Sequence, residues 1–217
     1  NGRYLVKLEG SITSELIQKI SESAQPVEVI LGNGDEGDAN DARFCIINSA
    51  VKEAILEHAS RNKIRPTIVR LPEPASKNLS SISRYPTLGL DTTLPQHRPS
   101  NEDVDFLPTQ DQYPVWYFFY GTLADPAVLS RHLGLASEPI LWPATVRGGV
   151  LKTWAGKYRA LVDGAESSVI DGSAYEVQSK AQEDALRAYE TSKYEVVRCM
   201  IEVGCRRIPG CTFRFVG

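Results

Sequence analysis

Apolar and polar positions in the first 72 residues change period in a regular order. Tyr4–Leu8 alternates apolar and polar residues, as a half-buried strand does, whereas Thr13–Ser23 repeats its apolar residues at helical spacing. The same two patterns predict three more strands, at Val27–Leu31, Phe44–Ile47 and Thr67–Leu71, and a second helix at 49–60. The predicted order is therefore strand, helix, strand, strand, helix, strand.

This order is typical of a split βαβ unit, so we expect a small ferredoxin-like α/β module over residues 1–72. Some domains of this shape bind RNA through aromatic residues on their two central strands. Here the third predicted strand carries a single aromatic residue, Phe44, and the charges of the region are nearly balanced. We therefore expect a structural or protein-contacting module, with a protein as its possible partner and no nucleic acid.

Proline dominates the next stretch: seven of the thirteen prolines fall between residues 72 and 114. Proline removes a backbone donor and fixes φ, so this stretch cannot sustain a helix or a central strand. We interpret residues 73–114 as a Pro-rich linker. It is either a disordered tether or an extended segment laid across a domain surface.

The linker is followed by a continuous run of apolar and aromatic residues, Val115–Tyr120, which is typical of a fully buried strand. The run ends at Gly121, and Asp125 with Pro126 provides the N-cap and first residue of a helix. Tyr120–Leu123 thus occupies a strand-to-helix turn. Glycine allows a ligand to approach the backbone there, and the N–H groups of the turn suit a carboxylate.

The remaining pattern predicts an α+β domain over residues 115–217. Short strands are separated by glycine-bearing turns, which favours a small mixed β-barrel or curled sheet over a doubly wound layer. The strands are expected at 144–150, 160–162, 168–177 and 195–203, and one clear helix at Ser179–Thr191.

Leu186 and Glu190 lie four residues apart on this helix and so share a face. If Leu186 points into the core, Glu190 projects in the same direction. Burial would then raise the pKa of its carboxyl toward the range that is useful for proton transfer. The alternative is that Glu190, at the end of the helix, extends into solvent.

Composition excludes several classes of function. Lys and Arg total 24 against 27 Asp and Glu, so nothing favours a polyanion or an anionic membrane surface, and no apolar run reaches the roughly 20 residues that span a bilayer. The four cysteines form no C-x-x-C pair, which indicates free thiols in a reducing, cytoplasmic setting and no metal site. The acidic cluster 35–41 lacks the alternation of an EF-hand loop, so we interpret it as a solvated turn.

Several motifs carry a family resemblance. Tyr117–Leu123 is similar to the Y-G-[ST]-L signature of the gamma-glutamylcyclotransferase-like superfamily, and Leu186–Glu190 followed by Tyr194 resembles its second signature. Segments at 156–161, Val169–Tyr175 and 210–213 resemble further strands of that family, in the right order. The resemblance covers about residues 115–217, and the most similar branch is the plant avirulence-induced-gene-like and fungal one.

The resemblance implies a small mixed β-barrel with flanking helices and an enzyme that needs no cofactor. Such enzymes cyclise a gamma-glutamyl amine or peptide to 5-oxoproline and release the amine. It implies Glu190 as the catalytic proton carrier, and substrate binding by Tyr120, Gly121, Thr122, Leu123, Tyr158 and Tyr194.

One position departs from the family pattern, because Arg159 stands where proline is usual and adds a positive charge. The alternative hypothesis is a non-catalytic binding protein that retains the fold, with its N-terminal module contacting a protein partner.

Overall fold

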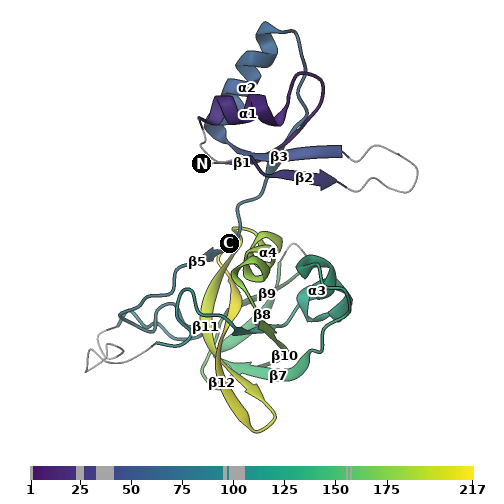
Figure 1. Ribbon diagram of the computed structural model, residues 1–217. Coiled ribbons are helices and arrows are strands. Elements are labelled where there is room, and N and C mark those ends of the chain that lie inside the picture. Colours follow the sequence, from purple (N-terminus) through teal and green to yellow (C-terminus); the bar gives the residue numbers. More distant parts are fainter. Residues whose placement is uncertain are drawn as a thin grey trace. The chain divides into compact units, whose positions relative to one another are not determined.

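The computed structural model describes residues 2–22, 27–32, 42–94, 97, 106–154, 156 and 158–217; the side chains of Trp154 and Tyr158 lie outside the description. The predicted acidic turn at 35–41 also lies outside it. The chain forms two compact units, Asn1–Glu73 and Pro74–Gly217 (Figure 1). Each unit is described by itself.

The N-terminal unit has the predicted ferredoxin-like fold. Its sheet has the order β2-β3-β1-β4, and every neighbouring pair is antiparallel. Thr13 and Asn48 begin the two helices, each with a side chain that accepts from a backbone N–H three residues further on. The elements are β1 (Arg3–Lys7), α1 (Ser14–Ser21), β2 (Val29–Gly32), β3 (Ala42–Asn48), α2 (Ser49–Arg61) and β4 (Ile68–Leu71).

Both helices cover the same face of this sheet (Figure 1). Val6, Cys45 and Ile47 from the strands pack there against apolar residues of the helices. On the opposite face, Ile46 and Val69 lie in register with the same residue of β1 and are exposed. The protein partner expected for this unit stays a prediction.

The C-terminal unit is a closed, mixed β-barrel of five strands, which confirms the predicted α+β class. The ring runs β12-β6-β10-β7-β11 and closes where β11 pairs with β12; the β12–β6 pair is parallel and the others are antiparallel. The strands are β5 (Ser76–Lys77), β6 (Val115–Phe119), β7 (Trp142–Arg147), β8 (Gly149–Trp154), β9 (Tyr158–Asp163), β10 (Val169–Val177), β11 (Tyr194–Val203) and β12 (Arg206–Phe215). The helices are the 3-10 turn η2 (Thr122–Ala124), α3 (Pro126–Leu133) and α4 (Lys180–Glu190).

The strand predicted at 144–150 is in fact two strands. Gly148, with φ of +82°, lies between β7 and β8, and this left-handed conformation is one that side chains other than glycine rarely adopt. A Cβ at Gly148 would also come within 3.1 Å of the Leu88 carbonyl oxygen. The chain therefore turns out of the barrel after β7, and β8 pairs with β9 in a separate hairpin.

The continuous apolar run of β6 is explained by core on both of its faces. Phe118 packs inside the barrel with Val146 and Ile201, whereas Tyr117 packs on the outer face with Leu186 and Phe213. Because successive side chains of a strand point to opposite sides, both rows must be apolar. The strand thus links the barrel interior to the layer beneath α3 and α4.

The Pro-rich stretch predicted as a linker belongs, from Pro74 on, to the C-terminal unit, and parts of it contact the barrel. β5 pairs in parallel with β11. The Arg198 side chain, only 4% exposed as a residue, donates hydrogen bonds to five main-chain carbonyls of this stretch, those of Ser80, Ser83, Tyr85, Phe106 and Pro108. A single guanidinium thus holds two separate segments of the stretch in place.

A second buried contact fixes the same stretch. Lys77 Nζ lies 2.8 Å from Glu183 Oε1, with both side chains at most 2% exposed. The hydroxyls of Tyr113 and Tyr117 each donate to the Glu183 carboxylate at 2.6 Å. Three donors therefore surround this carboxylate, which satisfies the rule that a buried charge must be paired and hydrogen-bonded.

We expect Arg198→Met to lower the free energy of unfolding by about 3 kcal/mol or more, because it leaves five buried or partly buried carbonyls without their charged donor. Limited proteolysis should then cut within residues 78–110 first. Arg207→Met is the matched control, since that side chain is 70% exposed. Equal resistance of the two variants would contradict the role given to Arg198.

Candidate active site

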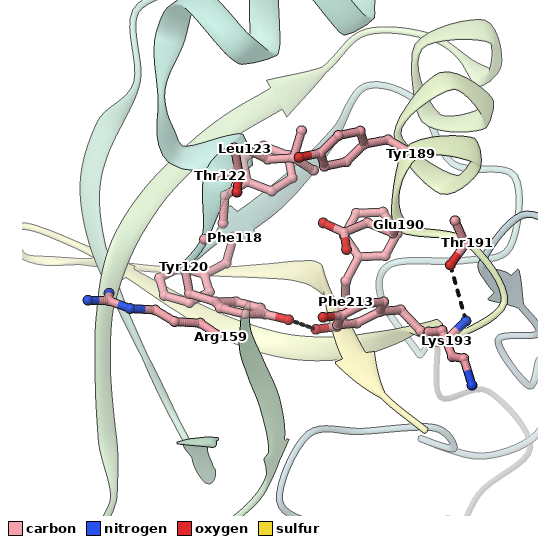
Figure 2. Close-up of a pocket in the computed structure, with 13 residues that line it drawn as sticks. Phe118, Tyr120, Thr122, Leu123, Arg159, Tyr189, Glu190, Thr191, Lys193 and Phe213 are labelled. Carbon is pink, nitrogen blue, oxygen red and sulfur yellow. Dashed lines mark hydrogen bonds between the residues drawn. The ribbon is translucent and has the colours of Figure 1, made fainter. Parts of the chain in front are cut away.

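A pocket of about 850 Å³ lies where the end of β6 meets the end of α4 (Figure 2). It brings together every predicted site residue except Tyr158, whose side chain lies outside the described part of the structure. The residues that line it are Phe118, Phe119, Tyr120, Gly121, Thr122, Leu123, Arg159, Tyr189, Glu190, Thr191, Lys193, Tyr194 and Phe213.

Glu190 is the last residue of α4 and extends into this pocket. Leu186, one turn earlier on the same face, is fully buried and fixes the orientation of the helix. Figure 2 shows the Glu190 carboxylate directed into the cavity between Tyr189 and Phe213, so the solvent-facing alternative does not describe this structure. Burial raises the pKa of the carboxyl to about 7.

The turn after β6 forms the wall opposite Glu190. The N–H groups of Ala124 and Asp125 donate to the carbonyls of Gly121 and Thr122. Within the described chain this leaves the N–H groups of Thr122 and Leu123 without a backbone acceptor, as at any helix start. A Cβ at Gly121 would meet no atom within 4 Å, so the space beside this backbone is open.

Two tyrosines shape the pocket without titrating near neutral pH. The Tyr120 hydroxyl donates to the Phe213 carbonyl at 2.9 Å, which ties the end of β6 to β12. Burial, with a smaller effect of the Glu190 charge, raises the pKa of Tyr120 and of Tyr194 above their usual range. Both phenols therefore stay neutral and can act as hydrogen-bonding and packing groups.

Two cations lie at the edge of the pocket. Lys193 Nζ donates to the Gly217 carbonyl at 3.0 Å, and Figure 2 shows it and the Arg159 guanidinium pointing away from Glu190. Arg159 is exposed and has no ion-pair partner among the described residues. The Glu190 carboxylate is thus left without a salt bridge in the described part of the chain, which is consistent with its raised pKa.

The residue that follows Glu190 has an unusual backbone conformation. Thr191 has φ of 63° and ψ of 176°, a region that is nearly exclusive to glycine and costs about 1–3 kcal/mol elsewhere. Its hydroxyl accepts a long bond from the Lys193 N–H, at 3.5 Å. Such a residue beside a candidate catalytic group indicates that the end of α4 is held in place by its surroundings.

We expect Thr191→Gly to stabilise the fold by about 1 kcal/mol, because glycine adopts this conformation without strain. The same change should lower catalytic activity, since the segment that fixes Glu190 becomes more flexible. Thr191→Ala keeps the strain and is the matched control. Chemical denaturation of both variants checks this, and a Gly variant no more stable than the Ala variant would contradict it.

The raised pKa of Glu190 also predicts a pH-dependent stability. A carboxyl whose pKa is about 7 when folded and 4.5 when unfolded stabilises the fold fully below pH 4.5, and this contribution is lost as the pH rises through 7. The free energy of unfolding of the wild type, relative to Glu190→Gln, should fall by roughly 3 kcal/mol across this window. Urea denaturation at pH 4.5 and pH 8 measures it; identical pH dependence in both proteins would contradict the assignment.

The described residues form no cluster of metal ligands, no membrane-spanning helix and no disulfide. No group of three or more His, Cys, Asp or Glu side chains among them is placed to hold a metal ion. No helix in the described ranges is both long and apolar enough to cross a bilayer. All four cysteines are free thiols.

The C-terminal unit is thus a closed α+β barrel with a carboxylate facing a pocket at the end of α4. Residues 117–214 match the family model described as gamma-glutamyl cyclotransferase, AIG2-like. The match covers less than half of the chain and supports the superfamily for the C-terminal unit. None of the curated proteins compared with the chain is similar in sequence.

Three solved structures are similar to all or part of the chain. Two solution structures of Arabidopsis thaliana proteins share 22% and 21% identity, with TM-scores of 0.42 and 0.43. They cover 48% and 50% of this chain, and the chain covers 69% and 66% of theirs. The crystal structure of YkqA from Bacillus subtilis shares 12% identity at a TM-score of 0.39, over 100% of this chain and 84% of its own.

The sequence missed several residues of the pocket. Phe118, Phe119 and Phe213 have the sequence pattern of core residues, because an apolar side chain that lines a cavity cannot be distinguished by its spacing from one that is packed. Thr191 and Lys193 follow a helix end, where no periodicity assigns a direction. Tyr189 was recognisable, since it precedes Glu190 in the second signature.

Proposed function

We propose that the C-terminal unit is a gamma-glutamylcyclotransferase, which converts a gamma-glutamyl amine or peptide into 5-oxoproline and the free amine. The observation that carries the proposal is Glu190, a carboxyl with a pKa of about 7 that faces the open turn Tyr120–Leu123 across one pocket. The family match of residues 117–214 supports the same class of reaction.

The chemistry requires one proton carrier. The α-ammonium of the substrate gives a proton to the Glu190 carboxylate, and the free amine attacks the γ-carbonyl carbon to form the new C–N bond. When the tetrahedral intermediate collapses, the original C–N bond breaks and Glu190 returns the proton to the leaving nitrogen. The ring nitrogen loses its second proton to the released amine, which departs as an ammonium ion. No water, oxidant or other reactant is consumed. A pKa near 7 suits a group that must both accept and donate a proton at neutral pH.

The turn supplies the second requirement, which is orientation. The N–H groups of Thr122 and Leu123, together with the open space at Gly121, fit a negatively charged oxygen of the glutamyl part. Tyr120 and Tyr194, both neutral, would bound the folded-back chain of the substrate. Holding the amine against the γ-carbonyl in this way contributes the proximity on which an intramolecular reaction depends. Tyr158 remains an expected substrate contact.

Within the superfamily, we place the chain in the plant avirulence-induced-gene-like and fungal branch, on the motifs at Tyr117–Leu123 and Leu186–Glu190. Arg159 carries a positive charge at the pocket edge and would repel a cationic group close to it. This favours a leaving group that has no positive charge near Arg159.

The test is release of 5-oxoproline from a panel of gamma-glutamyl amines, amino acids and peptides. The wild type should convert at least one member, Glu190→Gln should not, and Glu166→Gln, an exposed carboxylate on the turn after β9, should match the wild type. If no compound is converted by the wild type, the catalytic proposal fails and the non-catalytic alternative takes its place.

A further inference from the structure

A second pocket, of about 840 Å³, opens at the other end of the barrel from Glu190. The side chains of β6 that point into the barrel show that the two pockets lie at opposite ends of it. Phe118 is buried inside the barrel, Tyr120 lines the Glu190 pocket, and Trp116, at the opposite end of the row, lines the second pocket. The packed interior of the barrel therefore separates the two.

Strand register directs a set of side chains into this barrel mouth. Trp116 pairs with Glu176, and Trp142 pairs with Ala174, a buried residue of the barrel interior. On the β11–β12 hairpin, Val203 pairs with Arg206, two residues beyond the pair formed by Ile201 and Ile208. Paired residues share a face and every second residue returns to it, so all these side chains lie on the inner face. Each of the five barrel strands contributes at least one side chain to the pocket, among them Trp116, Glu176, Trp142, Val203 and Arg206.

The lining of this barrel mouth is mostly apolar, and part of it is exposed to solvent. Trp142 is 51% exposed, although its register partner Ala174 is fully buried, and Trp116 and Val203 are only partly covered by the core. Leaving the apolar surface of two tryptophans exposed to water is unfavourable, and a bound ligand would cover it. Barrel mouths are also a preferred place for small-molecule sites.

Two opposite charges lie within the same mouth. The partly buried Glu176 carboxylate accepts a bond from the Gln178 side-chain amide at 3.2 Å and has no ion-pair partner among the described residues. Arg206, from the opposite side of the ring, likewise forms no ion pair within the described chain. The two do not pair with each other, so the mouth presents one free anion and one free cation around an apolar floor.

We propose that this barrel mouth binds a free α-amino acid with a large apolar side chain. Its ammonium group would pair with Glu176, its carboxylate with Arg206, and its side chain would cover Trp116 and Trp142. A ligand with a cation alone would face Arg206 unpaired, and one with an anion alone would face Glu176 unpaired. A zwitterion satisfies both charges at once. The inference does not depend on the activity proposed for the Glu190 pocket.

Isothermal titration calorimetry of the full chain tests the proposal with three ligands that share a phenylethyl group and differ in their charges. L-phenylalanine carries both charges, phenethylamine lacks the carboxylate, and 3-phenylpropionate lacks the ammonium group. L-phenylalanine should bind at least about tenfold more tightly than either analogue, because each lost charge-assisted pair costs about that factor. Absence of binding by L-phenylalanine, or equal affinity for the three ligands, would overturn the assignment.

Two variants identify the groups. Glu176→Gln should remove the preference for L-phenylalanine over 3-phenylpropionate, and Arg206→Gln should remove its preference over phenethylamine. Glu190→Gln should keep the wild-type affinity for L-phenylalanine. Loss of binding in Glu190→Gln with normal binding in the other two variants would place the ligand in the first pocket and refute the proposal.

Discussion

Replacing Glu190 by glutamine should lower kcat for 5-oxoproline release by about 10³-fold, within the range that general acid–base groups supply. Glutamine has nearly the shape of the glutamate but cannot carry the proton from the substrate ammonium to the leaving nitrogen. KM should change little, because the turn at Tyr120–Leu123 is intact. Steady-state kinetics with the best substrate of the panel measures both constants.

The control for this experiment is Glu166→Gln, which removes an exposed carboxylate outside the pocket and should leave kcat unchanged. Circular dichroism should show that both variants are folded. A Glu190→Gln protein with a wild-type kcat would remove Glu190 from the mechanism, whatever the substrate.

Replacing Lys77 by methionine should lower the free energy of unfolding by about 3–5 kcal/mol, which is the usual cost of leaving one member of a buried ion pair alone. The Glu183 carboxylate would keep its bonds from Tyr113 and Tyr117 but lose its cation, at a site where both side chains are at most 2% exposed. Urea denaturation followed by tryptophan fluorescence measures the loss.

A double variant and a surface variant make this second experiment specific. Lys77→Met with Glu183→Leu should recover part of the loss, because no unpaired charge remains. Lys180→Met, which breaks an exposed pair on the same helix, should change the free energy of unfolding by less than about 1 kcal/mol. If Lys77→Met is no more destabilising than Lys180→Met, the buried pair does not hold the Pro-rich stretch on the barrel.

The elements were predictable where a local pattern decides them. Thr13 and Asp125 cap helices as their residue types indicate, and the apolar run of β6 is buried on both faces. Closure of the barrel was not visible in the same way, since the parallel β12–β6 pair joins strands far apart in the chain. The break at Gly148 was missed because a glycine within a β-rich segment gives no sign of its φ.

The Pro-rich stretch shows a different limit of sequence interpretation. Its composition correctly excludes regular structure over most of its described length, but composition does not indicate what the stretch contacts. Two charged side chains decide this: Arg198, between buried residues in the middle of β11, and Glu183, on the buried side of α4. For Arg198, a charge between the apolar residues Val197 and Cys199 was the available signal.

For the candidate site, the sequence supplied the residues and the structure supplied their arrangement. Tyr120–Leu123 and Glu190 are about 70 residues apart in sequence, and only the packing of α4 beside the end of β6 places them around one cavity. Spacing on α4 indicated a shared face for Leu186 and Glu190. It could not decide whether that face met a cavity or water.

Product analysis in water enriched in oxygen-18 tests the proposed reaction most directly. Cyclisation by the α-amine uses no water, so 5-oxoproline should appear in equal amount to the released amine and carry no oxygen-18. Hydrolysis would instead give glutamate with one oxygen-18 atom in its γ-carboxylate. Unlabelled 5-oxoproline, dependent on Glu190, is the result we predict; labelled glutamate, or no product from any gamma-glutamyl compound, would contradict it.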